Sequence, residues 1–398
     1  METFKPLAIL RETEAIYQRL LEIRHHLHRY PELSFHEEGT QRYLAEQLRG
    51  LRPDDLTEVA RTGLLARMEG AGPGPVIVLR ADMDALPITE ENDVPYRSEV
   101  EGVMHACGHD VHMTCLLGAA TLLGKWRHRW QGTVLFLFQP AEESLPGGAK
   151  EIVESGILDR HHASLVAGQH VDPTLPAGTV GYRPGPYMAS SDELYLTVSG
   201  KGGHAALPAA VTNTPYIAAR TLTTLEDFVE ENTPGDFPSV LRFGKVVANG
   251  ATNIIPPEVK MEGTFRAFDE SWRENAHKKL QEITATIARE HHGRADLEIR
   301  KGYPVLVNDE KAVALARSFS EEMLGKNNVR ALDLRMTAED FAYYSQRYPA
   351  LFFRLGVAPP GRDEVPPLHS PRFDIHEPAL ITGAAHLTWL TLSFLQRW

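Results

Sequence analysis

The chain contains 398 residues, with 41 Lys and Arg against 53 Asp and Glu and a formal net charge of −12. This length exceeds what one hydrophobic core usually holds, so we expect two domains. The acidic balance without any basic block argues against nucleic acid as a partner, and no apolar run approaches the roughly 18 residues that span a membrane, so we expect no membrane partner either.

The first half of the chain alternates between helical and strand patterns. Apolar residues at helical spacing predict amphipathic helices over 8–29 and 37–50, and a strand is predicted over 59–68. Fully buried strands are predicted at residues 76–79, 133–138 and 165–168. Each of these ends in polar residues, and open α/β sheets bind ligands at that edge. Strands alternating with helices therefore predict an α/β catalytic domain.

The pattern changes near residue 190. Strands and helices in the order β-α-β-β-α-β are predicted at residues 194–198, 213–231, 239–248, 258–267, 271–291 and 296–300. This order is typical of a compact split βαβ domain, whose free face or edge strand could pair with a second copy. An α/β pattern returns after about residue 303. We therefore expect a discontinuous catalytic domain, residues 1–189 and 303–398, interrupted by an inserted domain, residues 190–302.

Cysteine usage favours a cytoplasmic location. Cys107 and Cys115 are the only cysteines, which is too few for a disulfide framework and typical of a reducing compartment. A disulfide between these two cysteines is the less favoured alternative. The first residues, METFKPLAIL, are too short and too acidic downstream for a secretory signal.

The densest set of metal-binding residue types lies between Met104 and His112, where three histidines, a cysteine and an aspartate occur in nine residues. Any one histidine is more often structural, so the cluster alone only favours a metal. Cys107 and His109 are separated by one residue and can therefore point to the same side of an extended loop. Thiolate and imidazole suit zinc, manganese, cobalt or nickel to different degrees.

Other candidate ligands follow later strands. Glu142 and Glu143 are adjacent, so in extended backbone they face opposite ways, and one could bind metal while the other holds a water proton. His170 and His369 lie beyond an apolar strand or in a Pro-flanked loop, where a structural role is equally open. Five candidate ligands exceed what one tetrahedral ion needs. The set therefore favours two ions that polarise an amide carbonyl.

Nine segments carry a family resemblance that extends over nearly the whole chain. In order they are RADMDALPI (80–88), MHACGHDVH (104–112), FQPAEE (138–143), GQHVDP (168–173), GKGGHAALP (200–208), NGATNIIPPEV (249–259), EGTFRAFD (262–269), TAEDFAYY (337–344) and LHSPRFD (368–374). With these segments the sequence resembles the two-metal aminoacylase/carboxypeptidase amidohydrolases, in the branch of hippurate hydrolases and auxin-conjugate hydrolases. The resemblance implies a mixed-sheet, zinc-exopeptidase-like α/β domain with an inserted ferredoxin-like α+β domain.

The resemblance also implies the metal site. Two divalent ions per subunit, zinc, manganese, nickel or cobalt, would be held by Cys107, His109, Glu143, His170 and His369. Glu142 would be the general base that activates the metal-bound water and passes a proton to the leaving amine. Asp84 would orient a metal-binding imidazole or tune that base. Asp82 stands where relatives outside this branch have a metal-binding histidine, and both a structural role and ligation stay open for it.

The inserted domain resembles the family's lid, which also forms the homodimer. The resemblance implies that His204 reaches a neighbouring subunit's active site and stabilises the oxyanion. Asn253 and Arg266 would grip the substrate carboxylate or carbonyl, for which an arginine fork is well suited. Their alternative roles are a turn-stabilising amide and a cation at a sheet edge. The chain departs from the branch at Ala209 and Asn213, where a histidine and an Asp-Pro are usual.

The expected function is hydrolysis of the amide bond of a small N-acyl amino acid. One alternative is a non-catalytic metal- or ligand-binding homologue, although such a protein has no need of an unligated base beside the metal. Another is an exopeptidase acting on small peptides. An endopeptidase is disfavoured, because the sequence has no HExxH signature and a two-metal cleft under a lid suits small substrates.

Overall fold

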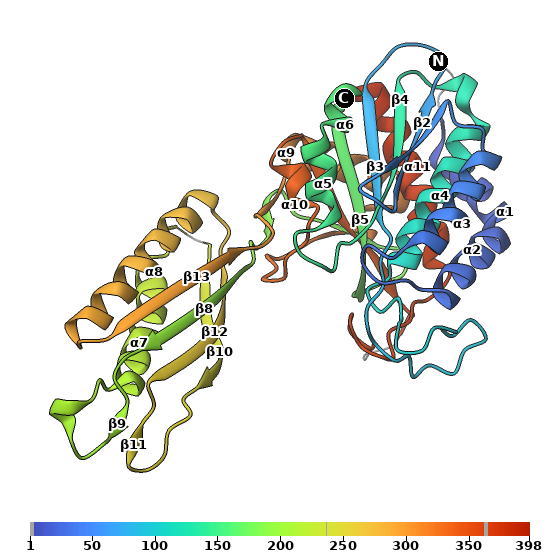
Figure 1. The fold of residues 1–398 in the computed structure, drawn as a ribbon. Coiled ribbons are helices and arrows are strands. Elements are labelled where there is room, and N and C mark those ends of the chain that lie inside the picture. The colour runs from blue at the N-terminus through green and yellow to red at the C-terminus, as the bar shows by residue number, and fades with distance from the viewer. Residues whose placement is uncertain (1–3, 236, 362–364) are drawn as a thin grey trace. The chain divides into compact units, whose positions relative to one another are not determined.

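A computed structural model describes residues 4–235, 237–361 and 365–398, and in it the chain forms two compact units (Figure 1). Unit 1 draws its described residues from Met1–Gly185, Val307–Asp333 and Asp340–Trp398, and unit 2 from Pro186–Leu306 and Leu334–Glu339. The inserted domain expected at residues 190–302 falls within unit 2.

Unit 1 is built on an eight-stranded mixed sheet with the order β1-β2-β4-β3-β5-β16-β6-β15. The strands are β1 Asp55–Val59, β2 Gly63–Glu69, β3 Val76–Asp82, β4 Thr133–Gln139, β5 Leu165–Pro176, β6 Val180–Tyr182, β15 Val329–Ala331 and β16 Ala350–Ala358. The central strands β4, β3, β5 and β16 run parallel, so their carboxyl ends share one edge. This sheet confirms the expected mixed α/β fold class.

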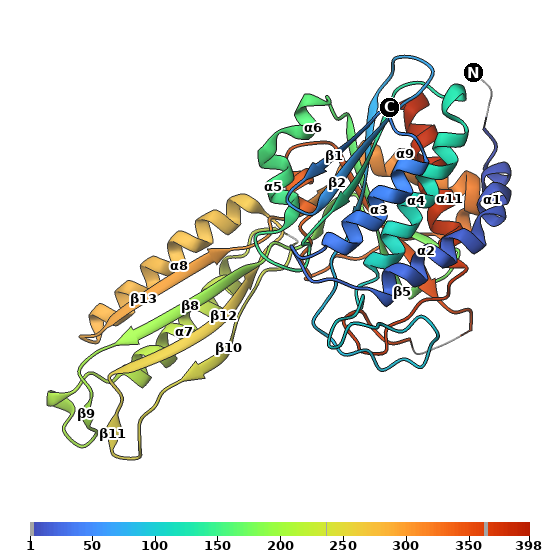
Figure 2. The ribbon, with the colours of Figure 1, turned by 45° about the vertical axis from the view of Figure 1, so that its right-hand side comes forward.

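Helices cover both faces of this sheet. They are α1 Pro6–Ala15, α2 Tyr17–Arg29, α3 Glu38–Gly50, α4 His109–Lys125, α5 Gly148–Ser155, α6 Ile157–Arg160, α9 Glu310–Leu324, α10 Ala342–Ser345 and α11 Ala379–Arg397. The largest core joins α1–α4, α9 and α11 to one face of the sheet, and Figure 2 shows α5 and α6 on the opposite face. Burial on both faces explains why the central strands are continuous apolar runs. Among the described residues, no helix has the length and apolar character to cross a membrane.

Two local predictions in unit 1 were wrong. The single helix expected over 8–29 is interrupted at Ile16, whose φ of −101° and ψ of 7° separate α1 from α2. The strand expected over 59–68 is the second half of a hairpin, because Ala60 and Arg61 adopt positive φ of 44° and 70° between β1 and β2. No glycine or proline lies at Ile16, and in the hairpin the glycine follows the turn at Gly63, so neither break carries a clear turn signal in the sequence.

Unit 2 has a four-stranded antiparallel sheet with the order β10-β12-β8-β13. Its elements are β8 Asp192–Ser199, α7 Thr214–Asn232, β10 Val240–Val247, β12 Glu258–Arg266, α8 Glu270–Glu290 and β13 Arg294–Lys301. This is the expected β-α-β-β-α-β order, and one core joins both helices to the sheet. The short strands β9 Gly203–His204 and β11 Ile254–Ile255 pair with each other. The chain passes between the units within β7 Gly185–Met188 and β14 Leu306–Asn308, and again on either side of Leu334–Glu339.

Candidate metal centre

The parallel strands of unit 1 place polar residues at one edge of the sheet. β3 ends at Asp82, and β4 ends at Gln139, three residues before Glu142. His170 lies inside β5 instead of beyond it, because this strand continues to Pro176 alongside β16. These elements and the first turn of α4 hold the candidate side chains.

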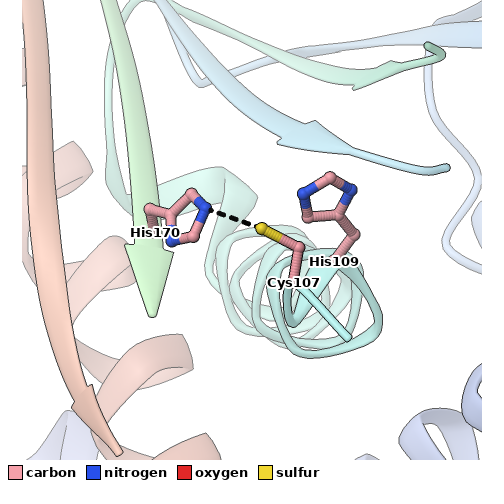
Figure 3. Close-up of side chains that lie close together, drawn as sticks. All are labelled: Cys107, His109 and His170. Atoms are coloured by element: carbon pink, nitrogen blue, oxygen red, sulfur yellow. Dashed lines mark hydrogen bonds between the residues drawn. The ribbon is translucent and has the colours of Figure 1, made fainter. Parts of the chain in front are cut away.

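Cys107, His109 and His170 face one another (Figure 3), with donor atoms that all lie within 4.8 Å of each other. The Sγ of Cys107 is 3.4 Å from Nε2 of His170. The extended loop expected between the first two residues is not found, because Gly108 has a left-handed φ of 80° and His109 opens α4. A Cβ at Gly108 would lie 2.5 Å from Cγ2 of Val171, so only glycine fits this turn.

Backbone contacts orient both imidazoles. Nδ1 of His109 lies 2.8 Å from the carbonyl oxygen of Asp84, and Nδ1 of His170 lies 2.8 Å from that of Val171. A carbonyl only accepts hydrogen bonds, so Nδ1 carries a proton in each ring, and Nε2 is the nitrogen that can bind a metal ion once it is unprotonated. This is the state in which a histidine binds a metal ion.

Glu143 and His369 complete the cluster. Oε1 of Glu143 lies 3.3 Å from Nε2 of His369 and 3.9 Å from Nε2 of His109. His369 adopts a positive φ of 63°, and its amide donates to Ala106 at 2.8 Å, which brings its loop to the segment that carries Cys107. The structure thus brings together all five predicted ligands.

The donor set fits divalent cations. Among the described residues, Nε2 of His109 and Oε1 of Glu143 are buried atoms without a hydrogen-bond partner. Burial alone would lower the pKa of His109, but Asp82 and Asp84 outweigh it and raise the pKa to about 10. Burial raises the pKa of Cys107 well above its usual range, with Glu143 adding to the effect. The surroundings therefore favour positive charge at the centre, and a cation would convert the thiol to a thiolate ligand.

Asp84 binds the backbone of the two glutamates. Its Oδ1 accepts from the amide of Glu142 at 3.0 Å, and its Oδ2 accepts from the amide of Glu143 at 2.9 Å and from the Ser34 hydroxyl at 2.6 Å. The extended backbone expected here was wrong, because the chain turns after β4 and Ala141 has a φ of 52°. Both glutamates consequently offer an oxygen to one cluster with His109.

Asp82 is engaged in structural contacts. Its two oxygens lie 2.6 Å from Nη1 of Arg80 and 2.5 Å from Nδ1 of His112. Nε2 of His112 in turn accepts from the amide of Val171 at 2.9 Å. Oδ2 of Asp82 also lies 3.7 Å from Nε2 of His109, in a group with His112 that could hold a metal ion, so both alternatives stay open for Asp82. The contacts with Arg80 and His112 fit the structural one. They also show that His112, which was not predicted as a site residue, positions the backbone beside His170. Its place three residues after His109 on one helix was the available signal.

The other predicted site residues lie in unit 2. His204 pairs with Ile254, and the amide of Ala205 donates to the carbonyl of Asn253 at 2.9 Å, so His204 and Asn253 are neighbours on the surface. Arg266 ends the nine-residue strand β12, roughly 25 Å from them at the usual rise per residue. Unit 2 therefore brings together two of these three residues.

A buried arginine joins two segments that carry ligands. Arg24 in α2 is 1% exposed and lies 3.2 Å from Asp110, 2.6 Å from Asp374 and 3.0 Å from Glu377. Asp110 follows His109 directly, whereas the other two carboxylates follow the His369 loop. Arg24 thus holds α4 and that loop to the same helix.

A sequence model of the family described as Peptidase family M20/M25/M40 matches residues 78–392. The N-acetylcysteine deacetylase of Bacillus subtilis (strain 168) is 35% identical over 96% of this chain and 98% of its own length. The N-acyl-L-amino acid amidohydrolase of Geobacillus stearothermophilus is 38% identical over 78% of this chain and 82% of its own. The crystal structure of Bacillus subtilis YXEP, described as a dinuclear metal binding peptidase from the M20 family, matches with a TM-score of 0.84 and 31% identity, covering 97% of this chain and 99% of that one.

Replacing Arg24 should destabilise unit 1 strongly. Arg24→Ala removes the cation from the buried Asp110 and from two partly exposed carboxylates, and we expect the free energy of unfolding to fall by about 3–5 kcal/mol. Urea unfolding followed by tryptophan fluorescence measures this, because four of the five tryptophans belong to unit 1. The matched control is Arg19→Ala on the same helix, whose exposed pair with Glu22 should contribute less than about 1 kcal/mol. Equal effects of the two substitutions would contradict the prediction.

The same cluster predicts a pH dependence. Burial alone would lower the pKa of His28, but Asp110 and Glu90 raise it to about 9. Because this folded pKa exceeds the usual 6.5, the protonated imidazole stabilises the fold below about pH 6.5, and this contribution is lost as the pH rises towards 9. The unfolding free energy of the wild type should fall over this interval by up to about 1.4 kcal/mol per pH unit relative to His28→Gln. The exposed control His36→Gln should follow the wild type, and parallel curves for wild type and His28→Gln would contradict the assignment.

Proposed function

The chain belongs to peptidase family M20/M25/M40, and from this premise we propose that it hydrolyses the amide bond of N-acyl amino acids or related small conjugates. The expected family resemblance is confirmed, and the chain is a metal-dependent amidohydrolase with a dinuclear centre. The observation that carries the finer proposal is the convergence, beside Glu142, of Cys107, His109, Glu143, His170 and His369.

These five residues are proposed to hold two divalent ions. Bound there, zinc, manganese, nickel or cobalt ions would supply the positive charge that polarises an amide carbonyl and lowers the pKa of water. The mixture of one thiolate, three imidazoles and one carboxylate is compatible with each of these metals. Among the described residues, His109 Nε2 and Glu143 Oε1 are buried without a hydrogen-bond partner, and this supports the assignment.

Glu142 is proposed as the general base. Its carboxylate is buried in the same cluster as His109 and Glu143. Asp84 holds its backbone amide, and Oε1 accepts from the amide of Asp340 at 3.4 Å. In this role Glu142 takes a proton from the attacking water and delivers it to the nitrogen of the leaving amine.

The substrate class is proposed from the relatives together with unit 2. Both relatives described above carry names of enzymes that act on acylated amino acids. Arg266 would bind the carboxylate of such a substrate, with Asn253 as a second polar grip. His204 would serve a neighbouring subunit, a role that its exposed position and its separation from Arg266 along β12 support.

A homodimer through unit 2 and a cytoplasmic location complete the proposal. Strand β10 lies at one edge of the unit 2 sheet, and its Val246 is 53% exposed, so this edge offers a surface for pairing.

The location is proposed from the cysteines. Cys107 and Cys115 are both free thiols. Free cysteines are typical of a reducing compartment, and this supports the cytoplasm.

Amine release from model substrates tests the proposed function. The protein is stripped with EDTA, reconstituted separately with Mn²⁺, Zn²⁺, Co²⁺ or Ni²⁺, and assayed on N-acetyl, N-benzoyl and long-acyl amino acids and on dipeptides. We expect release from N-acyl amino acids that chelation abolishes and at least one metal restores, because the carbonyl needs the ions for polarisation. Full activity after chelation would contradict the mechanism. Faster cleavage of dipeptides would favour the exopeptidase alternative, and metal binding without turnover would favour the non-catalytic one.

Substituting Glu142 and Glu143 one at a time distinguishes the proposed general base from the proposed metal ligand. Glu142→Gln should lower kcat by about 10²–10⁴-fold, the usual contribution of a general base, while metal content stays at the wild-type value. Glu143→Gln, the matched neighbour, should instead lower the metal content. Elemental analysis of the purified variants, beside the amine assay, measures both quantities. Loss of metal in Glu142→Gln would contradict this assignment and indicate that Glu142 is a metal ligand.

A further inference from the structure

Glu37 has a fully buried carboxylate to which the proposed chemistry assigns no role. It is the N-cap residue of α3, yet its side chain makes no capping bond to that helix. The amides of Gly39 and Thr40 instead donate to the carboxylate of Glu32, at 2.9 and 2.7 Å. Because Glu32 accepts the hydrogen bonds of the amides at the start of α3, the carboxylate of Glu37 is free to bind groups outside that helix.

That carboxylate binds the residue before the proposed base. Oε1 of Glu37 accepts from the amide of Ala141 at 2.9 Å, and Oε2 accepts from the Thr62 hydroxyl at 2.5 Å. Ala141 has a φ of 52°, a left-handed conformation that is unfavourable for alanine and persists only when its surroundings enforce it. Burying a carboxylate likewise costs free energy unless it is hydrogen-bonded. The hydrogen bond between the two residues therefore stabilises both the Glu37 carboxylate and the turn at Ala141.

Glu37 and Asp84 act on consecutive amides. Glu37 binds the amide of Ala141, and Asp84 binds the amides of Glu142 and Glu143. Two buried carboxylates from separate segments therefore hold three successive N–H groups. On the other side of the turn, the amide of Gly148 donates to Ala141 at 3.1 Å. The turn is fixed from both sides, and without Glu37 the amide of Ala141 would lose its acceptor.

We propose that Glu37 is a positioning residue for hydrolysis: it enforces the left-handed turn at Ala141 and thereby aims the carboxylate of Glu142. It acts through the backbone. The inference rests on the role proposed for Glu142, but the anchoring of the turn can be measured without turnover.

The kinetic test compares Glu37→Ala with Glu37→Gln in enzyme reconstituted with Mn²⁺. Glu37→Ala should lower kcat by about 10- to 100-fold, the usual effect of removing a residue that orients a catalytic group, with KM and metal content unchanged. Glu37→Gln keeps a carbonyl oxygen for the Ala141 amide, and the Thr62 hydroxyl can rotate to accept from its NH₂, so most of kcat should return. The exposed neighbour Glu38→Ala should retain wild-type kcat. Wild-type kcat in Glu37→Ala, or equal losses in both Glu37 variants, would overturn the proposal.

Amide hydrogen exchange supplies the readout that does not depend on activity. Glu37→Ala should speed exchange at residues 141–143 relative to wild type, whereas Glu38→Ala should not. If Glu37→Ala fails to fold, Thr62→Val tests the same anchor by removing only the hydroxyl that fixes Oε2, with a smaller change in the same direction. Unchanged exchange in the folded Glu37 variant, or in Thr62→Val where the former does not fold, would refute the anchor. A wild type that hydrolyses no N-acyl amino acid would refute the proposed function, and the exchange result would still decide the anchor.

Discussion

The buried carboxylate of Asp84 is the interaction on which the centre depends. It accepts from the Ser34 hydroxyl and from the amides of Glu142 and Glu143, and its Oδ1 lies 3.3 Å from Nδ1 of His109. The turn after β3, the loop after β4 and the start of α4 are thereby fixed to one group. Burying a carboxylate is costly unless it is hydrogen-bonded, and these groups supply the hydrogen bonds. The segments that carry His109, Glu142 and Glu143 are therefore held in one defined arrangement around Asp84.

Buried arginines extend this arrangement away from the centre. Arg80 contacts Asp82 at 2.6 Å and Asp340 at 2.8 Å, and Asp340 also accepts from the amide of Ala149. Arg24 performs the equivalent task for Asp110 and the segment after His369. In both places a cation neutralises carboxylates contributed by separate segments, and it thereby ties those segments to the ones that carry candidate ligands.

The sequence was sufficient for the parts of this structure that have local signals. Apolar runs predicted the central strands, and motifs spread over the chain predicted the candidate ligands, whose side chains the structure brings close together. The contacts of Glu37 with Ala141 and of Arg24 with Asp374 could not be predicted, because each joins residues more than 100 positions apart. The left-handed turn at Ala141 was missed for a related reason: its conformation is enforced by tertiary hydrogen bonds and carries no glycine signal.

The five candidate ligands differ in exposure. Cys107, His109 and His170 are buried between α4 and the sheet, whereas the side chain of His369 is 52% exposed and that of Glu143 is 14% exposed. Solvent therefore reaches this cluster from the side of His369. On that side the loop that carries His369 is held by a hydrogen bond from its backbone amide to the carbonyl of Ala106 and, farther along, by the contacts of Arg24 with Asp374 and Glu377. The exposed candidate ligand is thus positioned by contacts on its interior side.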